Sequence, residues 1–241
     1  MSKNMKKLSL IIPCYNESKN LPLLLNRCND VITDNQIEIL IVDNGSTDNT
    51  NDVLNSLLPR FSFVKRVRVK ENKGYGNGII AGLKKASGEI IGWTHADMQT
   101  DPADALRGLE FFNTSNKEKI FVKGKRYGRP LLDVFFTLGM SIFETILLRK
   151  SMWDINAQPT LFHRNFFLTW KSPPNDFSLD LYAYFLAKNE KFEIKRFNVF
   201  FGKRAHGVSH WNFNFSGKIK FIKRTLNYSF NLRQRIKKDN A

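Results

Sequence analysis

The stretch Glu89-Ile90-Ile91-Gly92-Trp93-Thr94-His95-Ala96-Asp97-Met98-Gln99-Thr100-Asp101-Pro102 decides the fold of this chain. Its first five residues are mostly apolar and predict a buried strand, and the polar residues after Trp93 predict a loop. A helix should begin next, because Asp101 is a good N-cap, Pro102 suits the first helical position and Asp104 lies in the first turn. The stretch therefore predicts a strand, a polar loop and a helix in succession.

Two oxygen-bearing side chains, Asp97 and Gln99, lie in the middle of this loop. In an extended backbone, residues two apart point the same way, so both oxygens are expected to face one point beyond the end of the strand. Divalent cations that carry substrate phosphates are held by one or two protein oxygens of this kind. The loop thus predicts an Mg²⁺ or Mn²⁺ site at Asp97 and Gln99, and ordinary polar loop residues are the alternative.

Charge is the unusual feature of the composition. The chain has 241 residues and 42% hydrophobic residues, which suits one large α/β domain or two small ones. Its 38 Lys and Arg exceed its 22 Asp and Glu, giving a formal net charge of +16. Such a chain is attracted to nucleic acid, anionic membranes or phosphate-bearing substrates. With 21 Phe, it suits a membrane interface at least as well as RNA.

The cysteines and the apolar runs indicate a cytosolic protein. Cys14 and Cys28 have no metal-ligand spacing, and reduced thiols are the simple interpretation. The apolar run before Pro13 is too short for a signal peptide and predicts a strand. The longest near-apolar run, Val134 to Leu148, is interrupted by Glu144 and is too short to span a bilayer, so a core or interfacial helix is expected.

Strands and helices alternate through the first half of the chain. Helix signals separate the strands, and Gly88 is predicted to cap the helix before the fourth strand. This alternation predicts an α/β fold with a doubly wound, mostly parallel sheet and helices on both faces. Ligands of such sheets bind beyond the carboxyl ends of the strands, where the polar turns 13–18, 43–48 and 95–101 should form one site. The predicted strands are 8–12, 37–42, 63–69, 89–93 and 120–122.

The second half does not continue the regular strand–helix alternation, and it ends in a basic segment. An apolar helix is expected over 131–150, a helix containing Asp180 over 176–189, and a strand over 192–201. From Lys218 to Lys238 there are eight Lys or Arg and no acidic residue, interleaved with apolar residues. No repeat or low-complexity linker separates the two halves.

Three motifs follow the first, second and fourth predicted strands: PCYNES (13–18), VDNGSTDNT (42–50) and HADMQTDP (95–102). In this order they resemble family 2 glycosyltransferases of the GT-A fold, and most resemble the polyprenyl-phosphate sugar synthases of the dolichol-phosphate mannosyltransferase type. The later segments KGKRYGRP (123–130), DINAQPTLFHR (154–164) and KRAHGVSHW (203–211) are similar to that branch and occur in its order. The resemblance covers residues 8 to 212.

This resemblance implies a catalytic domain over 1–212, with a nucleotide-sugar-binding half (1–125) and an acceptor half (126–212). Residues 213–241 would form a basic amphipathic tail. The family's Asp-x-Asp-x-Gln motif has His95 in its first position here, and metal binding is expected to continue on Asp97 and Gln99. A neutral histidine would hydrogen-bond the nucleotide without adding charge. The residues implied to bind the nucleotide-sugar are Pro13, Tyr15, Glu17, Asp43, Asn44, Lys73, His95, Ala96 and Asp97.

The acceptor side is implied by fewer residues. Arg126, Arg204 and Ser209 resemble the residues of the branch that meet the donor or acceptor phosphate, and guanidinium groups suit phosphate oxygens. Asp180 would be the general base if the acceptor is a hydroxyl, whereas a lipid phosphate needs no base. With Asp97 and these two arginines, Asp180 completes the predicted catalytic set.

The function implied is transfer of one sugar, with inversion, from a UDP-, GDP- or dTDP-linked donor to polyprenyl phosphate at the cytoplasmic face of a membrane. No second long apolar run follows helix 131–150, so a peripheral contact or a membrane-protein partner is expected. A sugar hydroxyl of a growing lipopolysaccharide, capsule or glycolipid is the alternative acceptor. The other classes are an inactive scaffold and a polyanion-binding module. Nucleic acid is not expected as a partner, because no RNA-binding motif is present. The oligomeric state is left open.

Overall fold

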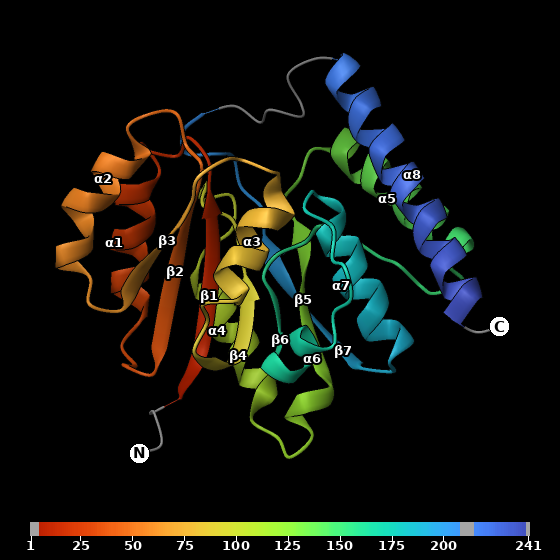
Figure 1. Ribbon diagram of the computed structural model, residues 1–241, viewed down its shortest axis with the longest axis horizontal. Helices are drawn as coiled ribbons and strands as arrows, with labels where there is room; N and C mark the ends of the chain where they lie inside the picture. The colour runs from red at the N-terminus through yellow and green to blue at the C-terminus, as the bar shows by residue number, and fades with distance from the viewer. Residues whose placement is uncertain (1–4, 208–214, 240–241) are drawn as a thin grey trace.

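A seven-stranded sheet forms the centre of the protein (Figure 1). The computed structural model describes residues 5–207 and 215–239. The strand order is β3-β2-β1-β4-β6-β5-β7, and among the described strands β6 alone runs antiparallel to its neighbours. The predicted doubly wound, mostly parallel sheet is therefore confirmed. The strands are β1 (Lys6–Cys14), β2 (Ile37–Asn44), β3 (Val64–Val69), β4 (Gly88–Trp93), β5 (Ile120–Tyr127), β6 (Thr160–His163) and β7 (Glu193–Phe200).

Helices cover both faces of the sheet. On β1, Ile11 contributes to one core cluster, whereas Leu10 and Ile12 contribute to the other, as the alternation of strand side chains requires. Because both faces are covered, the central strands are continuous apolar runs. One face carries α1 (Leu21–Val31), α2 (Thr50–Leu57) and α4 (Ala103–Leu109), and the other carries α3 (Tyr75–Leu83), α6 (Arg164–Leu168) and α7 (Ser178–Asn189).

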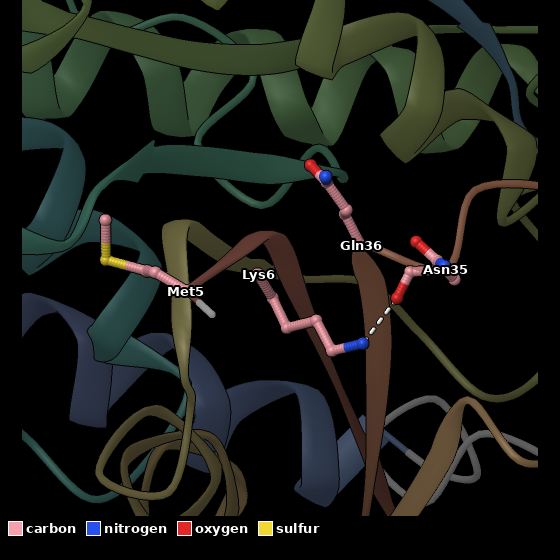
Figure 2. A pocket seen from close by; sticks show the side chains of 4 residues that line it. All are labelled: Met5, Lys6, Asn35 and Gln36. Carbon is pink, nitrogen blue, oxygen red and sulfur yellow. Dashed lines mark hydrogen bonds between the residues drawn. The ribbon is translucent and has the colours of Figure 1, made fainter. Parts of the chain in front are cut away.

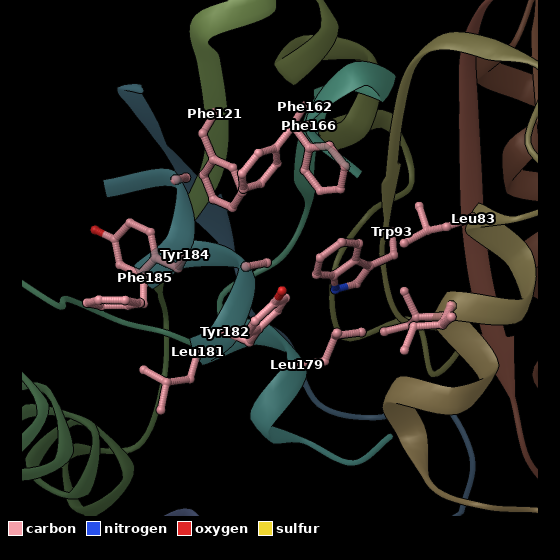
Figure 3. Packing of buried hydrophobic residues seen from close by; sticks show 14 of the residues in the cluster. Leu83, Trp93, Phe121, Phe162, Phe166, Leu179, Leu181, Tyr182, Tyr184 and Phe185 are labelled. Carbon is pink, nitrogen blue, oxygen red and sulfur yellow. The ribbon is translucent and has the colours of Figure 1, made fainter. Parts of the chain in front are cut away.

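Aromatic residues fill the core between the sheet and helices α3, α6 and α7 (Figure 3). Trp93, the last residue of β4, is fully buried and packs edge-to-face against Phe162 at 5.7 Å and Trp170 at 6.4 Å between ring centroids. Such aromatic contacts add to the stability that comes from area burial. They fix the end of β4, and so the polar loop that follows Trp93 begins from a rigid point.

Two long helices, α5 (Leu131–Leu148) and α8 (Phe215–Asp239), lie together at one end of the molecule (Figure 1). The Ser229 hydroxyl on α8 donates to Glu144 Oε1 on α5 at 2.6 Å. Among the described residues, α5 is the one helix long and apolar enough to cross a bilayer, although only 22% of its length is buried. Its exposed apolar side chains include Leu131, Leu132, Phe135, Ile142 and Ile146.

Several boundaries differ from the predictions: the helix after the Asp97 loop, for example, starts at Ala103, with Pro102 and not Asp101 at its N-cap. The predicted helix cap at Gly88 is wrong, because α3 ends at Leu83 and Gly88 opens β4. A Cβ atom at Gly88 would lie 2.5 Å from the backbone nitrogen of Ser9, so close pairing of β4 with β1 explains this glycine. The fifth strand extends to Tyr127 instead of residue 122, because its polar second half pairs with β7.

We expect Gly92→Ala to destabilise the fold by about 2 kcal/mol or more, because the new Cβ would lie 2.0 Å from the Thr160 carbonyl oxygen on β6. Gly139→Ala on α5 is the matched control. Its Cβ meets nothing within 4 Å, and replacing an exposed helical glycine should stabilise the protein by about 0.5–1 kcal/mol. Urea unfolding measures both variants, and equal effects would contradict the β4–β6 packing.

Glu144 should make stability depend on pH. Burial raises the pKa of this carboxyl group from 4.5 to about 7, against the opposing hydrogen bond from Ser229. The folded protein therefore binds more protons than the unfolded chain between these values, so stability falls as pH rises through this window. Glu144→Gln should gain about 3 kcal/mol over the unaltered protein at pH 8 and almost nothing at pH 4. Thermal unfolding against pH tests this, with the exposed Glu110→Gln as a control that leaves the profile unchanged.

Candidate active site

Three carboxylates meet at the carboxyl ends of β1 and its neighbours. Burial raises the pKa of the Cys14 thiol well above its ordinary value, and the charges of Glu17, Asp43 and Asp97 raise it further. The three predicted polar turns converge: Arg204 lies against both Glu17 and Asp97, and the Asn16 N–H donates to Ser46 Oγ at 3.1 Å. The thiol stays protonated and belongs to the core, and both cysteines are buried and free.

Asp97 lies just beyond β4 and is 4% exposed. Its Oδ1 accepts a hydrogen bond from the Gln99 backbone N–H at 3.1 Å, and its Oδ2 is 2.8 Å from Arg204 Nη2. The expected extended backbone between Asp97 and Gln99 is wrong, because Met98 has φ of 60° and turns the chain. The Gln99 side chain consequently turns toward the segment that follows β7, where its Nε2 donates to the Gly202 carbonyl at 3.1 Å.

The segment 202–207 crosses this loop as a strap. Its backbone N–H of Gly202 donates to the Gln99 carbonyl at 2.8 Å, and that of Ala205 donates to the Asp97 carbonyl at 3.3 Å. The strap holds the Arg204 guanidinium between Asp97 and Glu17, the latter at 3.6 Å. One arginine thus faces two carboxylates that belong to different strands.

The residues present fit a divalent cation that arrives with a phosphate-bearing ligand. Within 5–207 and 215–239 there is no group of three His, Cys, Asp or Glu side chains placed to hold a metal. Asp97 is a candidate carboxylate ligand, and the amide oxygen of Gln99 is a second candidate from the same loop although its Nε2 is bonded to the Gly202 carbonyl. Mg²⁺ is commonly bound by one or two carboxylates, with substrate phosphates and waters completing its octahedron. A site that needs the substrate's oxygens is consistent with this small protein contribution.

His95 occupies the first position of the motif and is partly buried. Burial lowers the pKa of its imidazole, the charges of Asp97 and Asp180 oppose this, and Arg126 and Arg204 add to the lowering. The side chain is therefore neutral near pH 7 and carries one N–H donor and one acceptor.

An aromatic wall flanks His95. The Tyr75 ring lies 6.0 Å from the imidazole, and it stacks on Phe177 at 4.8 Å with an interplanar angle of 11°. Neither aromatic residue was predicted from the sequence. Tyr75 stands within the glycine-rich segment KGYGNG at the start of α3, which is the one sign of it in the sequence.

The second strand's turn is tied to α3. Asp43 Oδ1 accepts a hydrogen bond from the Ser46 N–H at 3.0 Å. This bond closes the polar turn that the sequence predicted over 43–48. The Asn44 side chain donates to the Gly74 carbonyl at 2.9 Å, so its amide holds the start of α3 against β2. Asp43 is 2% exposed and Asn44 is 3% exposed.

The other predicted nucleotide residues occupy varied positions. Pro13, Tyr15 and Glu17 are partly buried around the carboxyl end of β1. The Lys73 side chain is 63% exposed and lies 3.8 Å from Glu71. The Ala96 side chain packs into the core, so a ligand could meet this residue through its backbone. Ser209 lies outside the described residues.

Three arginines surround one carboxylate at the carboxyl end of β5. Arg126 donates through Nε to Asp154 Oδ1 at 2.9 Å and through its backbone N–H to Oδ2 at 3.0 Å. Arg129 and Arg196 each approach Asp154 at 4.0 Å. Burial raises the pKa of Asp154, but the arginines lower it overall. This arginine cluster (Arg126, Arg129, Arg196) carries two positive charges more than Asp154 neutralises. The sequence predicted Arg126 and missed the other two.

A buried ion pair lies beneath the site. Lys123 Nζ is 3.4 Å from Asp180 Oδ1 and donates to Thr160 Oγ1 at 2.9 Å. Gln158 Nε2 donates to the same Asp180 oxygen at 2.7 Å. Burial lowers the pKa of Lys123 to about 8, with Asp180 opposing it. Asp180 is only 2% exposed, a placement that suits support of the site better than proton abstraction from an acceptor.

A separate hollow of about 280 Å³ opens at the other end of the sheet (Figure 2). It lies at the amino ends of β1 and β2, where the Lys6 ammonium donates to the Asn35 carbonyl. None of the predicted site residues lines it; its walls are Met5, Lys6, Asn35 and Gln36.

The protein has an α/β fold with carboxylates gathered at the carboxyl ends of its parallel strands. The family described as glycosyl transferase family 2 matches residues 9–227. The chain therefore belongs to glycosyltransferase family 2.

Solved structures agree on the GT-A fold. Glucosyl-3-phosphoglycerate synthase from Mycobacterium tuberculosis, in complex with Mn²⁺, UDP and glucosyl-3-phosphoglycerate, gives a TM-score of 0.68 at 16% identity and covers 95% of this chain and 80% of its own. A mannosyltransferase from Pyrobaculum calidifontis, in complex with GDP-Man and Mn²⁺, gives 0.64 at 17% identity over 84% of this chain and 59% of its own. At these identities the likeness concerns the fold.

Curated relatives match less than half of the chain. Undecaprenyl-phosphate 4-deoxy-4-formamido-L-arabinose transferase of Yersinia enterocolitica is 34% identical over 109 residues, 44% of this chain and 33% of that protein. The Serratia proteamaculans protein of the same name is 36% identical over 107 residues, 42% of this chain and 32% of its own length. The matched part thus spans about a third of these relatives.

Asp97→Asn should abolish the metal-dependent part of nucleotide binding. The unaltered protein at about 100 times Kd of a nucleoside diphosphate with Mn²⁺ should gain about 2.7 kcal/mol in stability, and the variant should show the same small shift with or without Mn²⁺. Thermal unfolding with UDP, GDP and dTDP measures this. Asp101→Asn is the control, because Asp101 pairs with Arg27 at the exposed end of the same loop. A full Mn²⁺-dependent shift in Asp97→Asn would exclude Asp97 as the ligand.

Proposed function

We propose that this protein transfers a sugar from a nucleotide-diphosphate donor to polyprenyl phosphate, with inversion at the anomeric carbon. The observation that carries the proposal is the closeness of two anion sites: the Asp97 loop with Arg204, and the arginine cluster around Asp154. The guanidinium groups of Arg126 and Arg129 lie over the Phe201 ring, 5.2 and 5.7 Å from its centre, and the next residue, Gly202, donates its N–H to the Gln99 carbonyl of the Asp97 loop at 2.8 Å. The curated relatives are undecaprenyl-phosphate 4-deoxy-4-formamido-L-arabinose transferases, which supports this choice of acceptor.

The donor would lie beyond the carboxyl ends of β1, β2 and β4. Asp97 and Gln99 would hold Mg²⁺ or Mn²⁺ against the diphosphate, and the cation would neutralise the charge that develops as the nucleoside diphosphate departs. Arg204 already contacts Asp97 and can place a second positive charge beside the same phosphates. His95, being neutral, would hydrogen-bond the donor, and Asp43 would meet the nucleoside.

The acceptor phosphate would bind at the arginine cluster. Arg126, Arg129 and Arg196 have side chains that are 10%, 11% and 16% exposed, so water screens them little. The Nε atoms of Arg129 and Arg196 are buried without a hydrogen-bond partner in the described part of the chain. A phosphate monoester carries anionic oxygens and needs no general base. One of these oxygens would form the new bond to the anomeric carbon while the bond to the diphosphate breaks on the opposite side.

The lipid part of such an acceptor has a matching surface. Arg129 lies two residues before α5, whose first turns expose Leu131, Leu132 and Phe135 to 76%, 83% and 67%. The basic helix α8 packs beside it. Apolar side chains that enter the headgroup boundary, together with Lys and Arg that meet anionic lipid, give a peripheral attachment to the cytoplasmic face of a membrane.

The direct test is transfer of label from UDP-, GDP- and dTDP-linked sugars to undecaprenyl phosphate in detergent or vesicles with Mn²⁺. Arg129→Gln should raise KM for undecaprenyl phosphate about tenfold or more, as expected for loss of a charged contact with phosphate, while KM for the donor stays unchanged. Arg68→Gln, on the exposed edge strand β3, is the control.

Transfer to a glycolipid hydroxyl but not to the lipid phosphate would overturn the acceptor assignment. The absence of both nucleotide binding and transfer would favour an inactive scaffold.

A further inference from the structure

Helix α8 contacts more than α5. Near its start, Arg224 Nε lies 3.2 Å from Asp176 Oδ2, in the loop that leads into α7. The same guanidinium lies 5.7 Å from the centre of the Phe177 ring. Arg224 of the C-terminal helix therefore contacts two successive residues of the 174–177 loop, Asp176 and Phe177.

This loop forms part of the wall of the site. Phe177 stacks on Tyr75, and Tyr75 faces His95. The backbone is joined as well, because the Asn77 N–H donates to the Asn175 carbonyl at 2.8 Å. A Cβ atom at Gly76 would lie 2.5 Å from the Pro174 carbonyl oxygen, which shows how closely the loop packs on the start of α3. Any displacement of the loop must therefore move the aromatic wall.

We propose that Arg224 is a positioning residue for donor binding: from α8 it holds the 174–177 loop, and through Phe177 and Tyr75 it fixes the wall beside His95. The inference rests on the proposed function, because it assigns the wall to the donor site. Arg224 touches no substrate in this scheme. It acts through the loop that it holds.

The chemistry of arginine suits this task. A planar guanidinium can bind a carboxylate at its edge and lie over an aromatic ring with its face. Lysine retains the charge but cannot do both. The side chains of Arg224 and Asp176 are 46% and 28% exposed. Because water screens a partly exposed ion pair, this one contributes little to the free energy of unfolding.

The rest of α8 is anchored independently of Arg224. Ser229 bonds Glu144 and is fully buried, and Leu232 is 6% exposed in the core. Removing Arg224 should consequently leave the helix in place and release the loop alone. This separation allows a positioning role to be distinguished from a structural one.

The experiment measures Kd for UDP, GDP and dTDP with Mn²⁺ by calorimetry, and Tm, in the full-length protein. Arg224→Ala should weaken binding of the preferred nucleotide about fivefold, the upper range for a partly exposed ion pair, with little change in Tm. Asp176→Asn should do the same, because Asn keeps the hydrogen bond to the Ser178 N–H that starts α7 and loses the charge. The double variant should be no weaker than either single variant, since both remove one interaction. Arg224→Lys should recover part of the affinity.

Lys223→Ala is the control, because it removes a neighbouring exposed charge from the same helix. Unchanged Kd in both single variants, or losses that add in the double variant, would overturn the role of Arg224. A fivefold loss in Lys223→Ala would also overturn it and assign the effect to the overall charge of α8. Failure of the unaltered protein to bind any of the three nucleotides would overturn the proposed function and this inference together.

Discussion

The convergence of like charges at the carboxyl ends of parallel strands governs the site. Glu17, Asp43 and Asp97 come from turns after three different strands, and parallel pairing of β1 with β2 and β4 brings them to one edge. Such a grouping is unfavourable unless cations lie nearby. Arg204 supplies one cation from the strap, 2.8 Å from Asp97. The strap is thus held by the charges that it neutralises as well as by backbone hydrogen bonds.

The second half of the chain has the opposite imbalance. Around Asp154, three buried or nearly buried guanidinium groups share one carboxylate. A surplus of positive charge that water screens poorly requires anions, and a transferase whose donor and acceptor both carry phosphate provides them. Under the proposed function the acidic edge and the arginine cluster would complement each other: the first would hold a cation with the donor, and the second would attract the acceptor. The formal charge of +16 has part of its explanation here.

The sequence predicts the sheet well because its signals are local. Buried strands are continuous apolar runs, and polar turns mark their ends, so β1, β2 and β4 and the convergence of their turns were found correctly. Gly88 was misassigned because a glycine after a helical pattern resembles a cap, whereas its cause is contact with Ser9 on another strand. The direction of Gln99 was wrong because the left-handed turn at Met98 has no marker in the sequence. Lys123, Arg129 and Arg196 were missed for a similar reason: a basic residue becomes informative only when its burial and its partners are known. The individual roles of the predicted site residues, Ser209 included, remain predictions.

Helix α5 is the element that the protein core explains least. A helix that is apolar on all sides is normally enclosed by protein or lipid, yet most of this one is not enclosed by the described chain. Its inner side is specific, with Glu144 bonded to Ser229 and Leu147 and Leu148 buried, whereas its outer side repeats large apolar residues about every turn. Exposure of that outer side to water would be energetically unfavourable. A lipid acceptor resolves the difficulty, because a phosphate held at Arg129 would place its hydrocarbon chain at the first exposed turns of the helix. The same residues would then attach the enzyme to its membrane and guide the acceptor toward the arginine cluster.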